Sequence, residues 1–455
     1  MARSLDELKR PANLGARAVA HRGSSPSGGA RLRVLEGGRA AAAPASTRAR
    51  PAAGARVAPS AAVASEGARD ARRLAALVGV LSIFGIIVIA AVSPIQEAQS
   101  GASPFALVER QVLWAGLGAI GFIVAARIEL HRLRRLVTVM LVLVTVALVA
   151  VLIPHLGKGA GGSSRWLGFG PITVQPSELA KLVFVVFAAD LVARREALGD
   201  HFNQLVRPLG LVLCFLAILI LKQPDMGTAM VLVAIAAAMW YAGGVRGRLL
   251  GAVSAGLLAV GSAVAFAAPY RRARLLSFFN PFGHASTSGY QLVQSLAALG
   301  SGHLAGAPMS SALATWFLPN AESDFVFAAI GNDFGLFGTV AVLAAFGYFA
   351  LLGARIAARA SDRFASLLAT AITCWLVFQA VVNIGGVLGV LPDTGIPLPF
   401  LSYGGSALIV ALFGTGLLAN ISRHPAGPGS LARDGAPRRQ GAQGRPVRLP
   451  GGRPR

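Results

Sequence analysis

The sequence alternates apolar runs of about twenty residues with short polar turns. As a helix, a run of this length crosses the hydrocarbon core of a bilayer, which is about 30 Å thick. Only 13% of the 455 residues are charged, whereas soluble domains contain about 25%. The apolar windows are 74–93, 107–126, 136–154, 179–193, 208–221, 226–243, 249–268, 326–353, 364–391 and 400–420. This pattern predicts an all-α, polytopic membrane protein with ten transmembrane helices.

The distribution of arginine predicts the orientation of these helices. An even number of spans puts both termini on one side, and with the N-terminus inside, the outer turns 94–106 and 392–399 contain no Lys or Arg. The inner turns contain Arg127, Arg132, Arg134 and Arg135, then Arg194, Arg195 and Arg207, then Arg246 and Arg248, then Arg355, Arg359 and Arg363. The positive-inside rule therefore predicts a multi-pass protein of the cytoplasmic (inner) cell membrane with both termini cytoplasmic. The large loop 270–325, between the seventh and eighth helices, is then extracytoplasmic.

The two ends of the chain differ from the apolar part. Residues 1–73 and 422–455 together carry +16 of the net charge of +23. They are rich in Ala, Gly, Pro, Ser and Arg and lack hydrophobic periodicity, so we expect disordered, basic cytoplasmic tails on either side of a ten-helix domain at 74–421. Neither tail contains interleaved aromatic residues or a nucleic-acid-binding module, so we expect membrane lipid, and no nucleic acid, as their partner.

Four polar elements on the predicted outer face interrupt the apolar pattern. They are 155–178, 222–228, 270–327 and 391–405. Ser177 is expected to cap the helix that follows it, and Pro224 is expected to break a tight helical hairpin. The last element contains three prolines within 392–399. It therefore cannot be regular helix and must be covered by protein or line a wet cavity.

In order and spacing, these elements resemble the SEDS (shape, elongation, division and sporulation) family, the FtsW/RodA peptidoglycan polymerases. The matching motifs are Ser164-Arg165-Trp166, Gln175-Pro176-Ser177-Glu178-Leu179-Ala180-Lys181, Gln223-Pro224-Asp225-Met226-Gly227-Thr228-Ala229, Gly289-Tyr290-Gln291, Ser323-Asp324-Phe325, Thr394-Gly395-Ile396-Pro397-Leu398-Pro399-Phe400 and Ser402-Tyr403-Gly404-Gly405-Ser406. The resemblance covers residues 74–421. Asn320 and the pair Asp225-Met226 favour the division-type (FtsW) branch. Glu322-Ser323-Asp324-Phe325 stands where the family usually has His-Thr-Asp-Phe.

The resemblance implies an enzyme, a peptidoglycan glycosyltransferase that polymerises lipid II (undecaprenyl-pyrophosphate disaccharide-pentapeptide) into glycan strands. It would act at the outer face of the cytoplasmic membrane, in cell division or elongation. The implied partners are a class B penicillin-binding transpeptidase and other membrane proteins of the divisome or elongasome. The acidic residue that is essential in the family corresponds to Asp324.

The chemistry of glycan polymerisation indicates what the site must contain. A sugar hydroxyl attacks an anomeric carbon that carries a lipid diphosphate, so the hydroxyl needs a base and the leaving group needs positive charge. An inverting displacement requires only one base. We predict Asp324 as that base. Its alternative role is an N-cap for the helix beginning at Val326, which Ser323 could cap equally well.

Seven further side chains are candidate substrate ligands: Arg165, Glu178, Lys181, Lys222, Arg271, Gln291 and Ser402. The cations among them suit a diphosphate; the alternative for the 271–274 cluster is anchoring to lipid headgroups. Glu178 and Lys181 are three residues apart on one helix, so they either form a structural ion pair or belong to the substrate cavity. Asp225 and Asp393 are expected to be turn formers or helix caps.

A divalent cation, Mg²⁺ or Mn²⁺, could bridge a carboxylate and the diphosphate oxygens. No ligand motif in the sequence demands one, so the metal ligands are not identified. Two other functions also suit a polytopic chain with helices broken by Gly and Pro. One is a flippase or transporter of a lipid-linked precursor. The other is a non-catalytic scaffold that activates a class B penicillin-binding protein.

Overall fold

The computed structural model describes residues 61–100, 103–159, 164–169, 172–267, 269–307 and 317–425. All of them belong to one unit of the chain, Arg56–Arg455. The predicted tails fall largely outside the described residues, at 1–60 and 426–455. Helices make up most of the described part, which confirms the all-α class.

Each of the ten predicted windows falls on a helix. These helices are α1 (Ala61–Ser100), α2 (Ala106–Ala125), α3 (Leu130–Leu152), α4 (Pro176–Arg195), α5 (Arg207–Leu221), α6 (Met226–Ala242), α7 (Gly247–Ala267), α11 (Val326–Ala358), α12 (Arg363–Val387) and α13 (Gly405–Arg423). Seven helices in the described ranges are long and apolar enough to cross a bilayer, which defines a multi-pass membrane protein. The exact count of ten spans and the cytoplasmic side of the termini stay predictions.

Several helix boundaries differ from the predicted windows, and two of the differences have a clear cause. Helix α1 begins at Ala61, inside the stretch assigned to the basic tail. The residues before 74 are rich in alanine, a strong helix former, and Glu66 and Asp70 pair with Arg359 at the end of α11. Helix α13 begins at Gly405, because the proline-rich segment before it is irregular.

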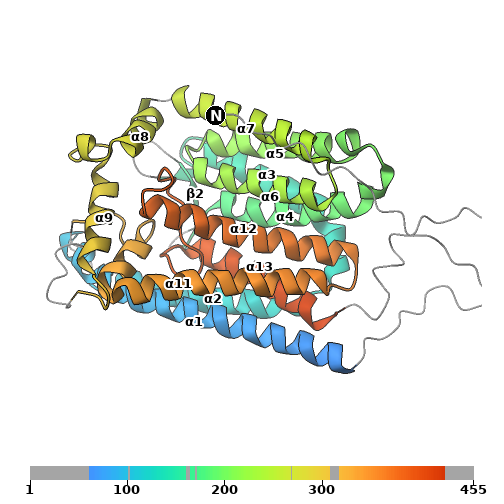
Figure 1. The fold of residues 1–455 in the computed structure, drawn as a ribbon, viewed down its shortest axis with the longest axis horizontal. Coiled ribbons are helices and arrows are strands. Elements are labelled where there is room, and N and C mark those ends of the chain that lie inside the picture. The colour runs from blue at the N-terminus through green and yellow to red at the C-terminus, as the bar shows by residue number, and fades with distance from the viewer. Residues whose placement is uncertain are drawn as a thin grey trace, which may run out of the picture. The chain divides into compact units, whose positions relative to one another are not determined.

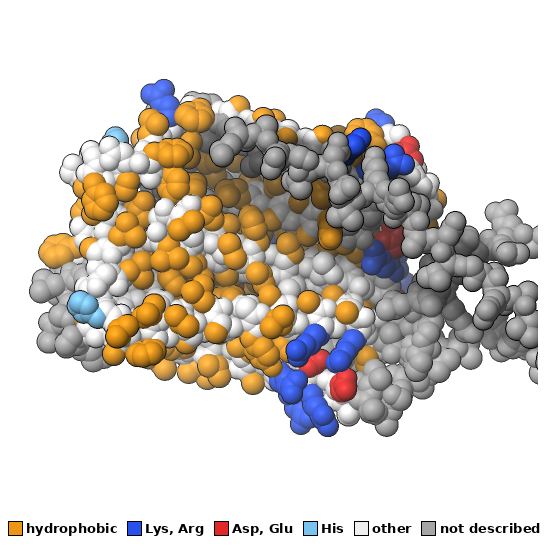
Figure 2. Space-filling model, viewed as in Figure 1, with side chains coloured by type: hydrophobic (Ala, Val, Ile, Leu, Met, Phe, Trp, Pro, Cys, Tyr) orange, Lys and Arg blue, Asp and Glu red, His pale blue; other side chains and the backbone are white. Residues whose placement is uncertain are grey.

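Helices α4 and α12 form the centre of the bundle. α12 packs against α4, α6, α11 and α13, and α4 also packs against α3; Figure 1 shows α12 between α11 and α4. Most side chains of α4 are buried, whereas large apolar side chains such as Leu143 on α3 and Leu211 on α5 are exposed. Figure 2 shows hydrophobic side chains across the middle of one face. Such extended apolar surfaces are typical of helices that contact lipid.

Shorter elements lie at the end of the bundle where α4 begins. The loop between α3 and α4 forms an antiparallel sheet of β1 (Gly157–Lys158), β2 (Trp166–Phe169) and β3 (Ile172–Val174), in the order β1-β2-β3. Lys158 pairs with Trp166, and Leu167 pairs with Gly157 and Val174. The predicted outer loop contains α8 (Pro269–Phe279) and α9 (Tyr290–Ser301), and α9 packs against α11 (Figure 1). The sequence did not predict the three strands, because they are too short to show hydrophobic periodicity.

Ion pairs join the helices at the opposite end of α4. Asp190 accepts from Arg134 of α3 and, at 2.8 Å, from Arg194 of its own helix. Arg363 at the start of α12 pairs with Glu196 at 2.7 Å. In Figure 2 most of the charged side chains in view gather at one end of the molecule. Several of the arginines that the sequence places in inner turns therefore pair with acids at one end of the bundle.

Candidate functional site

A cavity of about 560 Å³ lies where α4, α6 and α13 begin. Its walls come from parts of the chain that are far apart in sequence: the small sheet, the turn between α5 and α6, the loop before α11, and the irregular segment 391–404. The polar side chains that line it are Lys158, Arg165, Thr173, Gln175, Glu178, Asp225, Thr228, Asn320, Glu322, Ser323, Asp324, Tyr403 and Ser406. All four polar elements predicted on the outer face contribute to this cavity.

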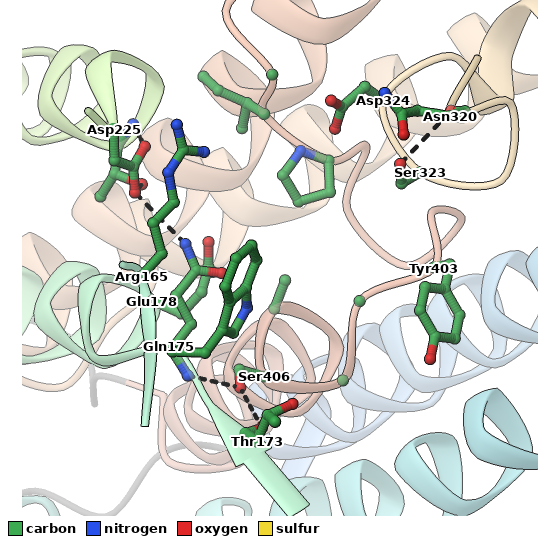
Figure 3. A pocket seen from close by; sticks show the side chains of 18 of the residues that line it. Arg165, Thr173, Gln175, Glu178, Asp225, Asn320, Ser323, Asp324, Tyr403 and Ser406 are labelled. Carbon is green, nitrogen blue, oxygen red and sulfur yellow. Dashed lines mark hydrogen bonds between the residues drawn. The ribbon is translucent and has the colours of Figure 1, made fainter. Parts of the chain in front are cut away.

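Asp324 lines the cavity from the loop that precedes α11. Its side chain is half-buried, and Figure 3 shows it on the side opposite Arg165, Glu178 and Asp225. Helix α11 starts with Phe325 at the N-cap position and has no side-chain cap among the described residues. Neither Ser323 nor Asp324 therefore occupies the N-cap position of α11.

The irregular segment 391–404 forms the part of the wall next to Asp324. Gly395 has a φ of 65°, a backbone conformation that glycine adopts without strain. Asp324 Oδ2 lies 3.5 Å from the position that a Cβ on Gly395 would take. Asp393 accepts a hydrogen bond from the Gly395 amide at 3.0 Å, so it forms the turn, as predicted. Gly395, Ile396 and Pro397 all line the cavity, which confirms the prediction made from the prolines.

Arg165 faces Asp324 from the other side of the cavity (Figure 3). Its Nε donates to Gln223 O at 3.1 Å and its Nη2 donates to Pro224 O at 2.5 Å. These bonds fix the guanidinium against the turn between α5 and α6 and use two of its five N–H donors. The remaining donors suit an anion in the cavity. Lys158, the second residue of β1 and opposite Trp166 in the sheet, adds a second cation.

Glu178 and Lys181 form a buried ion pair behind the cavity wall. Lys181 Nζ lies 2.9 Å from a Glu178 carboxylate oxygen, and its side chain is 0% exposed. It also donates to Gln379 Oε1 at 2.9 Å and lies over the Trp375 ring. Glu178 reaches the cavity lining, whereas Lys181 is not among its described lining residues. The structure therefore combines the two alternatives: a structural pair, one member of which faces the cavity.

Asp225 caps the start of α6, as predicted, and it also accepts a hydrogen bond from the hydroxyl of Ser177. Asp225 Oδ1 accepts from the Thr228 amide at 3.1 Å, and Oδ2 accepts from Ser177 Oγ at 2.9 Å. The prediction that Ser177 caps α4 was wrong: the helix begins at Pro176, with Gln175 at the N-cap position. Ser177 Oγ bonds Asp225 because the start of α6 lies beside the start of α4.

The other predicted ligands lie outside the described lining of the cavity. Lys222 is exposed at the end of α5, and Gln291 is half-buried in α9. Ser402 is buried, and its hydroxyl accepts from the Leu398 amide at 2.8 Å and donates to Ser323 O. The backbone of Arg271 is part of α8, but its side chain lies outside the described residues.

Sequence reasoning missed several lining residues, among them Lys158, Trp114 and Tyr403. Lys158 belongs to a strand of two residues, and a strand this short could not be recognised in the sequence. For a metal ion, the described residues provide no group of three His, Cys, Asp or Glu side chains that could hold one. A divalent cation that bridges one carboxylate and the diphosphate stays a prediction.

These features define a multi-pass membrane protein with a charged cavity at one end of its helix bundle. The chain belongs to the cell cycle protein family of FtsW, RodA and SpoVE, whose sequence profile matches residues 72–426. The membrane helices and the family membership make it a multi-pass cell membrane protein.

Known relatives cover most of the chain. It is 34% identical over 343 residues to the probable peptidoglycan glycosyltransferase FtsW of Geobacter metallireducens, covering 75% of this chain and 92% of that protein. It is 35% identical over 349 residues to the stage V sporulation protein E of Bacillus subtilis, covering 76% of this chain and 94% of that protein. Among solved structures, a chain from work on the structural coordination of polymerization and crosslinking by a peptidoglycan synthase complex has a TM-score of 0.63 at 27% identity. It covers 77% of this chain and 96% of its own length.

Proposed function

We propose that this chain is a peptidoglycan glycosyltransferase that polymerises lipid II at the outer face of the cell membrane. Its family and the name of its Geobacter metallireducens relative support this activity. The observation that carries the proposal is that Asp324 and Arg165 line one cavity from opposite sides (Figure 3). A base and a cation are the two groups that an inverting displacement of a diphosphate requires.

In the proposed reaction, the 4-hydroxyl oxygen of one sugar forms a bond to the anomeric carbon of another. The bond from that carbon to the lipid diphosphate breaks, and its electron pair leaves with the diphosphate oxygen. Asp324 accepts the hydroxyl proton as general base. Arg165 and Lys158 stabilise the negative charge of the leaving diphosphate. With attack from the face opposite the leaving group, a single base gives inversion at the anomeric carbon.

Glu178 has a different role in this scheme. Its carboxylate lies 2.9 Å from Lys181 Nζ, and it is the partner of that buried cation. Glu178 therefore shapes the wall and provides an acceptor for substrate hydroxyls, while Asp324 takes the proton. This division of roles follows from the different surroundings of the two carboxylates.

We propose a crosslinking enzyme as partner. The structural neighbour belongs to a complex that coordinates polymerization with crosslinking, and the expected partner of this chain is a class B penicillin-binding transpeptidase of the divisome or elongasome. Such a partner would act on glycan strands as they leave the cavity. Copurification of the two full-length proteins from membranes is the expected outcome.

The function is tested with the purified full-length protein and its partner transpeptidase supplied with lipid II. We expect wild type to form glycan polymer and Asp324→Ala to form none, at equal thermal stability. Full polymerisation by Asp324→Ala would contradict the role of the carboxylate. Translocation of labelled lipid II across vesicles without any polymer would instead identify a flippase. Stimulation of the transpeptidase without polymer would identify a scaffold.

A further inference from the structure

Three consecutive carbonyls of the loop before α11 are held by hydrogen bonds from other segments. The Tyr403 amide donates to Glu322 O at 2.8 Å. Ser402 Oγ donates to Ser323 O at 2.5 Å. Asn383 Nδ2 donates to Asp324 O at 2.8 Å. The position of Asp324 is therefore determined by α12 and by the end of the segment 391–404.

Asn383 bonds the backbone carbonyl of Asp324 itself and joins it to the irregular segment 391–404. The same Nδ2 also donates to Ile396 O at 2.8 Å. Because both contacted atoms are carbonyl oxygens, the side-chain atom between them must be the amide nitrogen. Asn383 is only 6% exposed, so solvent cannot replace these bonds. One side chain thus fixes the backbone of Asp324 and the backbone next to Gly395, against which the carboxylate lies.

Gln379, one helical turn earlier on α12, connects the same segment to the opposite wall. Its Nε2 donates to Pro397 O at 2.9 Å. Its Oε1 accepts from Lys181 Nζ at 2.9 Å, and Lys181 holds Glu178. Residues four apart lie on one face of a helix, so a single face of α12 holds the backbone beside Asp324 and the ion pair behind Glu178.

We propose that Asn383 is a positioning residue, which sets the distance of the Asp324 carboxylate from the cations across the cavity. This inference rests on the proposed function of Asp324 as a base. Asn383 is not among the described residues that line the cavity, so it acts on the reaction through Asp324 and not through the substrate. A displacement of reacting groups by about 1 Å can slow a reaction by roughly 100-fold, whereas the binding of lipid II depends on other residues.

The test compares kcat and KM for lipid II in the full-length protein with its partner. Asn383→Leu keeps the approximate size of the side chain and removes both donated bonds. We expect kcat to fall by roughly 10- to 100-fold and KM to stay within about twofold. Where the leucine variant does not fold, Asn383→Ser, which keeps one donor, is compared in the same way and should show a smaller fall in kcat.

Asn420 offers a matched control at the other end of the bundle. Its Nδ2 donates to Ala125 O at 3.0 Å and to Ile128 O at 2.6 Å, and it is 4% exposed. Asn420→Leu therefore removes the same type of bond between one amide and two carbonyls, away from the cavity. We expect it to lose thermal stability as Asn383→Leu does, but to keep the kcat of wild type.

Hydrogen exchange of the peptide 318–326 provides a readout that does not depend on activity. We expect faster exchange in Asn383→Leu and the wild-type rate in Asn420→Leu. If Asp324→Ala is inactive while Asn383→Leu keeps the kcat of Asn420→Leu, the positioning role is overturned and the proposed function stands. If Asp324→Ala is fully active, both are overturned.

Discussion

Asp324 and Arg165 carry opposite charges and line the cavity from opposite sides (Figure 3). Both stand in motifs from which the sequence predicted a site. Asn383 lies inside an apolar window and gave no local signal, because its partners are the carbonyls of Asp324 and Ile396, reached only through folding. Ser177 was assigned to its own helix, but its hydroxyl bonds Asp225, 48 residues away. Short-range rules missed such pairings because they compare only neighbouring residues.

At the residue scale, Arg165→Lys tests whether the shape of the cation matters as well as its charge. Lysine keeps the positive charge. Its single ammonium group cannot reproduce the planar guanidinium, which donates from Nε to Gln223 O and from Nη2 to Pro224 O. We expect the polymerisation rate to fall by about tenfold or more. The control is Lys222→Ala, since Lys222 is exposed and outside the described lining. Equal rates for wild type and Arg165→Lys would show that charge alone is sufficient.

At the scale of elements, the contact between α4 and α12 holds the cavity wall. The periodicity of the sequence predicted both helices, and the prolines predicted the irregular segment after α12. The sequence could not predict that Gln379 accepts hydrogen bonds from both Lys181 and Trp375, at 2.9 and 3.0 Å. These contacts depend on how the helices pack. The sheet β1-β2-β3 was also missed, because its strands are short and its pairing is not encoded in an alternating pattern.

The buried pair on α4 leads to a prediction about stability. Lys181→Met leaves the buried carboxylate of Glu178 without its partner, which should destabilise the protein by about 3–5 kcal/mol. The double variant Glu178→Gln with Lys181→Met removes both charges and should be more stable than Lys181→Met alone. Thermal unfolding of the detergent-solubilised proteins measures both effects. A double variant that is less stable than the single variant would contradict this account of the pair.

At the scale of the whole molecule, the cavity and the interhelical ion pairs lie at opposite ends of α4. Glu178, in its first turn, reaches the cavity, and Asp190, near its end, accepts from Arg134 and Arg194. The positive-inside rule puts the arginine end in the cytoplasm. The hydrophobic pattern and the charge distribution predicted, without any knowledge of the packing, that the polar outer elements and the arginine-rich turns lie at opposite ends of the bundle. The packing was needed to show that the four outer elements meet in one cavity.

This polarity can be measured directly. A cysteine that replaces Thr394, beside the cavity, should react with a membrane-impermeant maleimide added to intact cells. A cysteine that replaces Arg355, near the end of α11, should react only after the membrane is permeabilised. The native Cys214 and Cys374 are first replaced by serine. Labelling of the Arg355 site in intact cells would contradict the orientation and place the cavity on the cytoplasmic side.

The most direct test of the central claim separates binding of lipid II from its conversion. Asp324→Asn keeps the size of the side chain but removes its ability to accept the hydroxyl proton. The account predicts that this variant, in complex with the partner transpeptidase, binds lipid II with the Kd of wild type and forms no glycan polymer. If Asp324→Asn instead polymerises lipid II at the wild-type rate, Asp324 is not the base.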